Sequence, residues 1–167
     1  MLFFGDLGNK ELSKKIGPQT HYPKIGIFPD GEIRVRIEND VCDKEVVILK
    51  SLCPPVNDNI VEFCLTIDAL KRSGAKKIMG IISYIAYARA DHIFRTGEGV
   101  PLETVIRMIE TSGLDEAIII DPHSIKMGEM FQIPVKLESA LPLFAEKIKS
   151  LNLSEYTIVS PDMGGIR

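Results

Sequence analysis

Polar side chains that can bind a metal ion or a phosphate follow several apolar runs of this sequence. Asp121 and His123 come directly after the run from Ala117 to Ile120, and Asp162 follows a later run. Carboxylate oxygens and imidazole nitrogens can ligate a divalent cation, and Mg²⁺ takes only one or two protein ligands when phosphate oxygens supply the rest. The residues alone favour a plainer interpretation, in which the aspartate caps the next helix and the histidine lies on the surface.

A second polar cluster, Tyr87-Ala88-Arg89-Ala90-Asp91-His92, follows the apolar run from Lys77 to Ile85. The forked donors of Arg89 match the geometry of a phosphate. The alternative is a solvated loop with an Arg–Asp pair. The pair Gly164-Gly165 would let backbone N–H groups approach a phosphate, although ordinary turns use such a pair as well.

The elements that must position these side chains alternate along the chain. Strands are predicted at Glu45 to Leu49, Lys77 to Ile85, Ala117 to Ile120, Pro134 to Leu137 and Thr157 to Val159. Helices are predicted at Asn57 to Ser73, Leu102 to Ser112 and Ser139 to Leu151. This alternation predicts an α/β fold with an open, mostly parallel sheet flanked by helices. Because the carboxyl ends of parallel strands share one edge, we expect Arg89, Asp91, His92, Asp121, His123 and Asp162 to gather there.

Two local signals add detail to this fold. Pro29-Asp30-Gly31 separates Lys24 to Phe28 from Glu32 to Ile37, which predicts a β-hairpin near the N-terminus. Asn57 stands where its side chain can cap the helix that follows.

Composition excludes several classes of protein. The chain has 167 residues, of which 45% are hydrophobic and 26% charged, as in a globular domain. The net charge of −3 gives no basic field for nucleic acid. No apolar run reaches the roughly 18 residues that span a bilayer. The three cysteines have no C-x-x-C spacing, which favours free thiols in a cytoplasmic protein.

Taken together, the motifs resemble those of the ribose-phosphate pyrophosphokinases, or phosphoribosyl pyrophosphate synthetases. Phe28-Pro29-Asp30-Gly31-Glu32 is similar to the family's F-x-D-G-E hairpin, and Asn57-Asp58-Asn59 opens a helix as it does there. Tyr84 to Asp91, Asp121-Pro122-His123 and Ser160 to Gly165 resemble the family's later motifs, in the same order and at similar spacing.

The resemblance implies transfer of the diphosphoryl group of ATP to C1 of ribose 5-phosphate, with Mg²⁺ as cofactor, to make phosphoribosyl pyrophosphate for nucleotide biosynthesis. By resemblance, Arg89 and Asp91 would help to bind ATP, and His123 and Asp162 would hold Mg²⁺ directly or through water. The hairpin residues would contact the adenine or ribose of ATP bound mainly by a neighbouring subunit; these are Phe28, Asp30 and Glu32. A homo-oligomer, a dimer or larger, is therefore expected.

The sequence also departs from the family pattern. Ala90 stands where the family usually has glutamine, which removes an amide that could bind the nucleotide. Family members are about twice as long and carry a second α/β domain with the ribose 5-phosphate loop. We therefore predict that residues 1–150 form the amino-terminal synthetase-like domain and that residues 151–167 form the first strand of a second domain, otherwise missing.

Three interpretations remain open from the sequence. The chain is the amino-terminal half of a synthetase that needs a complementary synthetase subunit, or it is a catalytically inactive, synthetase-associated subunit that oligomerises or regulates. The third interpretation is a nucleotide-binding α/β module of another family. None of them involves nucleic acid or a membrane.

Overall fold

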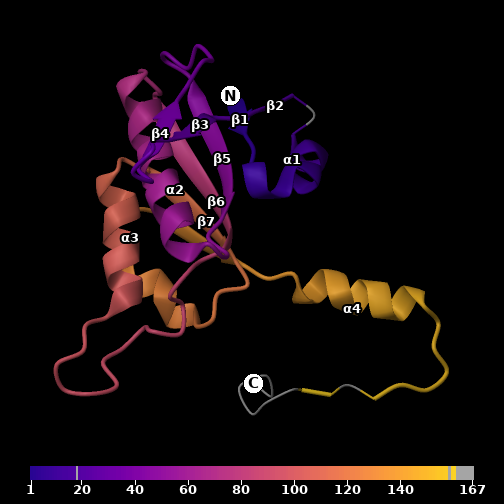
Figure 1. Cartoon of the computed structure of the whole chain (residues 1–167). Helices are drawn as coiled ribbons and strands as arrows, with labels where there is room; N and C mark the ends of the chain where they lie inside the picture. The colour runs from indigo at the N-terminus through magenta and orange to yellow at the C-terminus, as the bar shows by residue number, and fades with distance from the viewer. Residues whose placement is uncertain (18, 158, 161–167) are drawn as a thin grey trace.

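The computed structural model describes residues 1–17, 19–157 and 159–160, and most of these form a parallel sheet with helices beside it (Figure 1). The six strands lie in the order β2-β1-β5-β6-β7-β8, and every neighbouring pair is parallel. The strands are β1 (Leu2–Phe4), β2 (Thr20–His21), β5 (Glu45–Ser51), β6 (Lys77–Tyr84), β7 (Glu116–Ile120) and β8 (Val135–Glu138). The predicted α/β class with a mostly parallel sheet is confirmed.

Within the described residues, four α-helices and two short 3₁₀ segments lie between or after the strands. They are η1 (Leu7–Asn9), α1 (Lys10–Ile16), α2 (Val56–Arg72), α3 (Pro101–Thr111), η2 (Ile125–Met130) and α4 (Leu141–Ser150). Helices α2 and α3 pack next to each other against the sheet, as Figure 1 shows. Apolar side chains at helical spacing bury one face of α2 because they point at the sheet; the fully buried ones are Phe63, Ile67 and Leu70.

The predicted cap of α2 is wrong. The helix begins at Val56, one residue before the expected cap, and Pro55 occupies the N-cap position without a side-chain cap hydrogen bond. Asn57 therefore lies inside the first turn of the helix, where its side chain is available for another partner.

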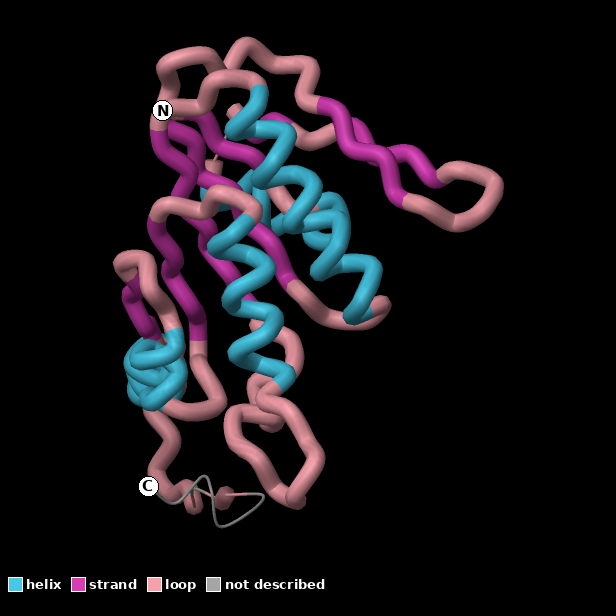
Figure 2. The backbone as a smooth tube through the Cα atoms, turned by 90° about the vertical axis from the view of Figure 1, so that its left-hand side faces the viewer, coloured by secondary structure: helices cyan, strands magenta, loops and turns pink. Residues whose placement is uncertain are grey.

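The predicted hairpin is present as β3 (Lys24–Ile27) and β4 (Ile33–Arg36), paired antiparallel. Gly31 lies at the turn with a φ of 93°, a conformation that a residue without a Cβ adopts at little cost. One strand of the hairpin, β4, lies beside α2. Figure 2 shows the closed end of the hairpin extending away from the main sheet, so its tip residues are open to a partner.

Helix α4 stands apart from the body of the domain in Figure 1, and none of its residues is buried. Its predicted apolar face is therefore exposed, with Leu141, Phe144 and Ile148 all open to solvent. The predicted last strand, Thr157 to Val159, includes a residue outside the described ones, so that strand stays a prediction. None of the helices in the described part of the chain combines the length and apolar character that crossing a bilayer requires.

A cluster of charges lies inside the domain at the carboxyl end of β5. The ammonium of Lys50 lies 2.6 Å from Glu62 Oε1 and 3.8 Å from Asp6 Oδ1. The Lys50 and Asp6 side chains are only 6% and 4% exposed. Asp6 Oδ2 also accepts a hydrogen bond from the backbone N–H of Ser51. The cluster thus ties the segment after β1 to β5 and α2.

Candidate active site at the carboxyl edge of the sheet

The ends of two neighbouring strands, β6 and β7, form a pocket that contains three of the predicted polar side chains. Arg89 comes from the loop after β6, and Asp121 and His123 follow β7. All three line one hollow of about 470 Å³, together with Ser83 and Tyr87. The parallel register of β6 and β7 brings these loops together, because both strands end at the same edge.

The loop that carries Arg89 is a tight turn rather than an open excursion. Tyr87 has a φ of 60°, a left-handed conformation that is uncommon for a residue with a side chain. Its carbonyl oxygen accepts a hydrogen bond of 2.8 Å from the N–H of Ala90. This turn reverses the chain at Arg89, which is exposed and lines the pocket.

Asp91 and His92 lie in a neighbouring hollow, which they share with Ser124 and Lys126. His92 Nδ1 lies 2.6 Å from Asp91 Oδ1. The hydrogen bond from His92 lowers the pKa of the Asp91 carboxyl, and the nearby charge of His123 contributes to the same shift. The Arg–Asp pair that the sequence left open is absent among the described ion pairs, since Asp91 pairs with His92.

Asp121 combines a strained backbone with a structural hydrogen bond. Its φ is 46°, again in the left-handed region. Its Oδ1 accepts hydrogen bonds from Ser139 Oγ at 2.8 Å and from the N–H of Ala140 at 3.0 Å. Asp121 therefore anchors the residues before α4 and also lines the pocket beside His123. It does not cap the next helical segment, η2, whose N-cap is Ser124.

The donor set of this pocket fits a magnesium ion that arrives with a nucleotide rather than one held by the protein alone. Within residues 1–17, 19–157 and 159–160, no group of three or more His, Cys, Asp or Glu side chains is arranged to hold a metal ion. Mg²⁺ usually keeps several waters and binds one or two protein groups plus substrate phosphates. His123, with Asp121 beside it, can supply that small share. Asp162, the other predicted ligand, lies outside the described residues.

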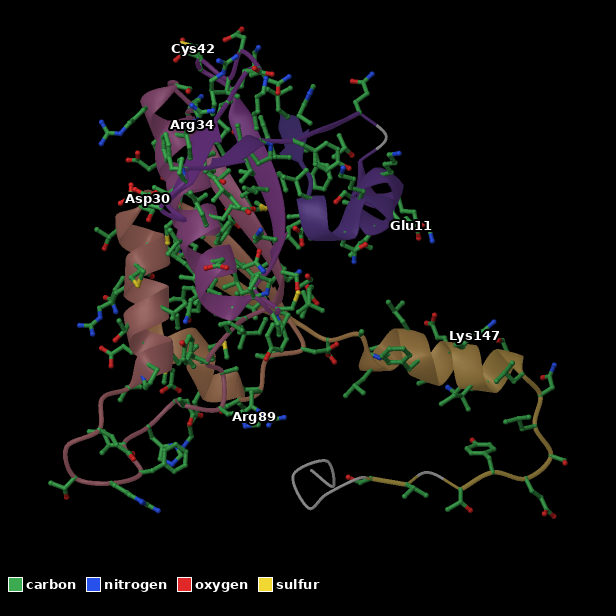
Figure 3. The ribbon with its side chains drawn as sticks, in the orientation of Figure 1. Glu11, Asp30, Arg34, Cys42, Arg89 and Lys147 are labelled. Carbon is green, nitrogen blue, oxygen red and sulfur yellow. The ribbon has the colours of Figure 1, made fainter. Side chains whose placement is uncertain are left out.

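The three predicted hairpin residues lie away from this pocket. Asp30 Oδ1 accepts a hydrogen bond from the N–H of Glu32, and the Arg34 guanidinium lies 5.4 Å from the centre of the Phe28 ring. Figure 3 shows Asp30 and Arg89 well apart in the same molecule. The fold therefore brings Arg89 and His123 together and leaves Phe28, Asp30 and Glu32 at a separate exposed tip.

Comparison with known proteins shows the family to which the chain belongs. Residues 6–113 match the model of the N-terminal domain of ribose phosphate pyrophosphokinase. The chain belongs to this family. A ribose-phosphate pyrophosphokinase 1 of Streptococcus pneumoniae is 37% identical over an alignment of 164 positions, which covers 95% of this chain and 51% of that protein. A ribose-phosphate pyrophosphokinase of Thermosipho africanus is 35% identical over all of this chain and 55% of that protein.

A solved structure gives the same result for this pyrophosphokinase domain. The phosphoribosylpyrophosphate synthetase of Mycobacterium smegmatis superposes with a TM-score of 0.84 at 28% identity, over 89% of this chain and 51% of that one. The chain thus spans about half the length of the relatives it matches. The family model ends at Gly113, so the segment with His123 is matched by the longer relatives and not by that model.

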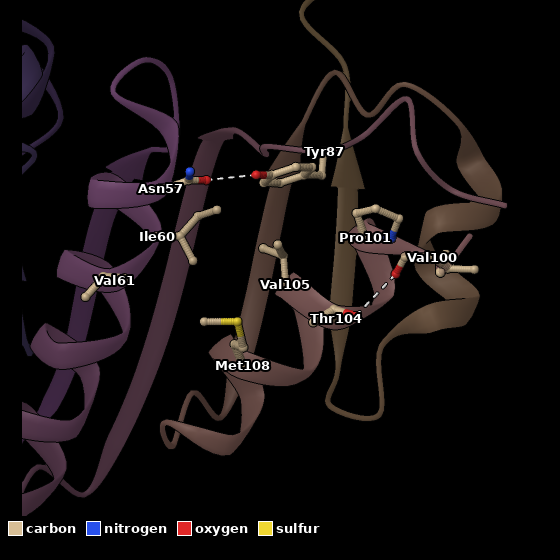
Figure 4. A pocket seen from close by; sticks show the side chains of 10 residues that line it. Asn57, Ile60, Val61, Tyr87, Val100, Pro101, Thr104, Val105 and Met108 are labelled. Atoms are coloured by element: carbon tan, nitrogen blue, oxygen red, sulfur yellow. Dashed lines mark hydrogen bonds between the residues drawn. The ribbon is translucent and has the colours of Figure 1, made fainter. Parts of the chain in front are cut away.

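The sequence did not reveal one interaction at this edge of the sheet. The hydroxyl of Tyr87 donates a hydrogen bond of 2.8 Å to Asn57 Oδ1, across 30 positions of sequence. Figure 4 shows this bond at one end of a mostly apolar pocket of about 440 Å³ between α2 and α3. Tyr87 lines this pocket and also the one that contains Arg89. The sequence singled out both residues, Asn57 as a helix cap and Tyr87 as part of a polar cluster, but gave no sign that they meet.

Proposed function

We propose that this chain supplies the Mg²⁺-ATP half of a ribose-phosphate pyrophosphokinase site. In the proposed reaction the C1 hydroxyl oxygen of ribose 5-phosphate attacks the β-phosphorus of ATP. The bond from that phosphorus to the oxygen bridging the α-phosphorus breaks, AMP leaves, and the hydroxyl loses its proton. The observation that carries the proposal is that Arg89 and His123 line one pocket at the carboxyl edge of the sheet.

The roles of the side chains follow from the demands of phosphoryl transfer, which needs positioning and charge neutralisation more than covalent chemistry. Arg89 is exposed and would donate paired hydrogen bonds to a phosphate. Asp91, held by His92, would help to bind the nucleotide. Mg²⁺, when bound with ATP, would neutralise charge on the phosphate oxygens, and His123 and Asp162 would hold it directly or through water.

The exposed hairpin tip supports an oligomeric site. Phe28, Asp30 and Glu32 lie apart from Arg89 within one chain, so they would serve a nucleotide bound by a neighbouring copy. A dimer or larger assembly is therefore part of the proposal. Its test is the mass in solution by light scattering, and a monomer at micromolar concentration would contradict it.

The second half of the site would come from a second domain. The relatives extend about as far again as the region matched here, and we propose that residues 1–150 are the nucleotide domain and residues 151–167 begin the next one. Ribose 5-phosphate would bind to that second domain. The reported relatives carry synthetase names, which favours this interpretation over a non-catalytic subunit. A cytoplasmic location would keep the free cysteines reduced.

Calorimetry with Mg²⁺-ATP tests the nucleotide site. Replacing Arg89→Ala or His123→Ala should each weaken binding by about tenfold or more, because a hydrogen bond to a charged group contributes roughly 1.5–3 kcal/mol. Arg72→Ala is a matched control, since Arg72 lies at the end of α2, near the opposite edge of the sheet, and pairs with Asp68. Unchanged affinity in both site variants would overturn the assignment.

An activity assay tests the division of labour. This chain is incubated with Mg²⁺-ATP and ribose 5-phosphate, with and without a separately produced carboxyl-terminal half of a synthetase. AMP and phosphoribosyl pyrophosphate should form only in the mixture. Sustained turnover by this chain alone would show that the second domain is not needed.

A further inference from the structure

Tyr87 lies between a rigid helix and the turn that presents Arg89. Its hydroxyl donates a hydrogen bond to Asn57, which lies in the first turn of α2. Its backbone carbonyl accepts the hydrogen bond from Ala90 that closes the turn around Arg89. The same residue therefore contacts helix α2 through its side chain and the turn that carries Arg89 through its backbone.

The backbone at Tyr87 needs such a restraint. A φ of 60° places this residue in the left-handed region of the backbone. Residues other than glycine, asparagine and aspartate seldom adopt that conformation. A strained conformation persists only where its surroundings impose it. The tyrosine ring lies against the pocket between α2 and α3, and its hydroxyl is fixed at one end of that pocket.

The anchor itself belongs to a helix that is packed against the core of the domain. Helix α2 is fixed to the sheet by fully buried side chains such as Phe63 and Ile67. Asn57 lies in the first turn of that helix, so its Oδ1 is a fixed point on the surface. A bond of 2.8 Å to this point limits how far the Tyr87 ring, and the turn joined to it, can move.

We propose that Tyr87 is a positioning residue for the nucleotide site: through its hydrogen bond to Asn57 it holds the left-handed turn that presents Arg89 to the phosphates of ATP. The inference rests on the proposed function, because it assigns Arg89 to the nucleotide. It concerns the order of the turn before ATP arrives, and Tyr87 need not touch the nucleotide.

Binding measurements on the intact chain give the first test. Tyr87→Phe keeps the ring and removes only the hydroxyl, and it should weaken Mg²⁺-ATP binding about threefold to tenfold, the effect of losing one ordinary hydrogen bond. Asn57→Ala should give the same loss, and the double variant should bind no worse than either single one. Tyr156→Phe is the matched control, since Tyr156 is exposed outside the sheet.

A double-mutant cycle separates positioning from a general structural role. In an Arg89→Ala background, Tyr87→Phe should cause no further loss, because the residue through which it acts is gone. An equal fold loss in both backgrounds, or no loss from Tyr87→Phe alone, would overturn the inference. The unfolding midpoint should stay close to that of the wild type in Tyr87→Phe, which excludes global destabilisation as the cause.

Amide hydrogen exchange tests the turn without any nucleotide. The N–H of Ala90 is bonded to the Tyr87 carbonyl, and its exchange should become severalfold faster in Tyr87→Phe and stay unchanged in Tyr156→Phe. If the wild-type chain binds no Mg²⁺-ATP, the proposed function fails, and this exchange measurement still decides the positioning claim. Equal protection of Ala90 in Tyr87→Phe and wild type would refute it.

Discussion

Replacement of Lys50 by methionine should destabilise the domain far more than the same replacement of an exposed lysine on a neighbouring strand. The Lys50 ammonium lies between two carboxylates, 2.6 Å from Glu62 and 3.8 Å from Asp6. Methionine keeps an unbranched side chain of similar length, so Lys50→Met removes the charge and leaves little cavity. The variant leaves the Asp6 and Glu62 carboxylates without their shared cation.

The expected magnitude follows from the burial of the carboxylates. Asp6 is 4% exposed and Glu62 is 19% exposed, so water can solvate little of the first and some of the second. Removing one partner of a buried ion pair costs about 3–5 kcal/mol. Asp6 keeps hydrogen bonds from the N–H groups of Gly8 and Ser51, which reduces the penalty. We therefore expect a loss near the lower end, about 3 kcal/mol.

Urea unfolding measures the change, and the chain contains its own control. Lys77 lies on the adjacent strand β6 and pairs with Glu116, but its side chain is 46% exposed. Lys77→Met should cost less than about 1 kcal/mol, since exposed ion pairs contribute little. Glu62→Gln combined with Lys50→Met should restore part of the stability by removing one orphaned charge. If Lys50→Met and Lys77→Met are equally stable, the argument from burial is wrong.

Three further predictions concern single side chains. Gly113→Ala should lower the free energy of unfolding by about 1–2 kcal/mol, because φ is 106° there and an added Cβ would lie 2.7 Å from a neighbouring side chain. Gly99→Ala is its control and should be nearly neutral, since open space surrounds Gly99. Glu110→Ala should cost about 1–3 kcal/mol by freeing two backbone N–H groups before β8, seen as faster exchange of those amides. His92→Ala should raise the pKa of Asp91 toward its ordinary value in a carboxyl-carbon NMR titration. Because the folded pKa is lowered, the Asp91–His92 pair stabilises the loop above the ordinary aspartate pKa, and that contribution is lost as the pH falls through the lowered pKa.

The parallel sheet was predictable because its strands carry a strong local signal. The central runs, such as Lys77 to Ile85, are almost wholly apolar, as strands covered on both faces must be. Strand β6 ends one residue before the predicted boundary. The first strands, β1 and β2, were missed because strands of three and two residues are too short to show a period.

The candidate site was predictable only in part, for a similar reason. The rule that parallel strands have their carboxyl ends at the same edge of a sheet predicted that Arg89 and His123 would lie at one edge. The Tyr87–Asn57 bond joins residues 30 positions apart and depends on a turn with positive φ, which nothing in the local sequence indicates. The assignment of Asn57 as a cap failed because the helix begins at Val56, with Pro55 at the N-cap position. The buried Lys50 cluster likewise depends on Asp6, 44 positions away, which no local pattern connects to it.

The strand order has a consequence for synthesis and for protein engineering. Strand β1 is an interior strand, with Leu2 paired to Val46 and Phe3 paired to Thr20. On the ribosome, β1 can pair with β2 early but must wait for β5 to emerge before both of its sides are covered. A tag joined to the exposed Met1 should leave the sheet intact, whereas deletion of Leu2–Phe4 would split β2 from the other strands. Shortening this end of the chain therefore opens the middle of the sheet rather than trimming its border.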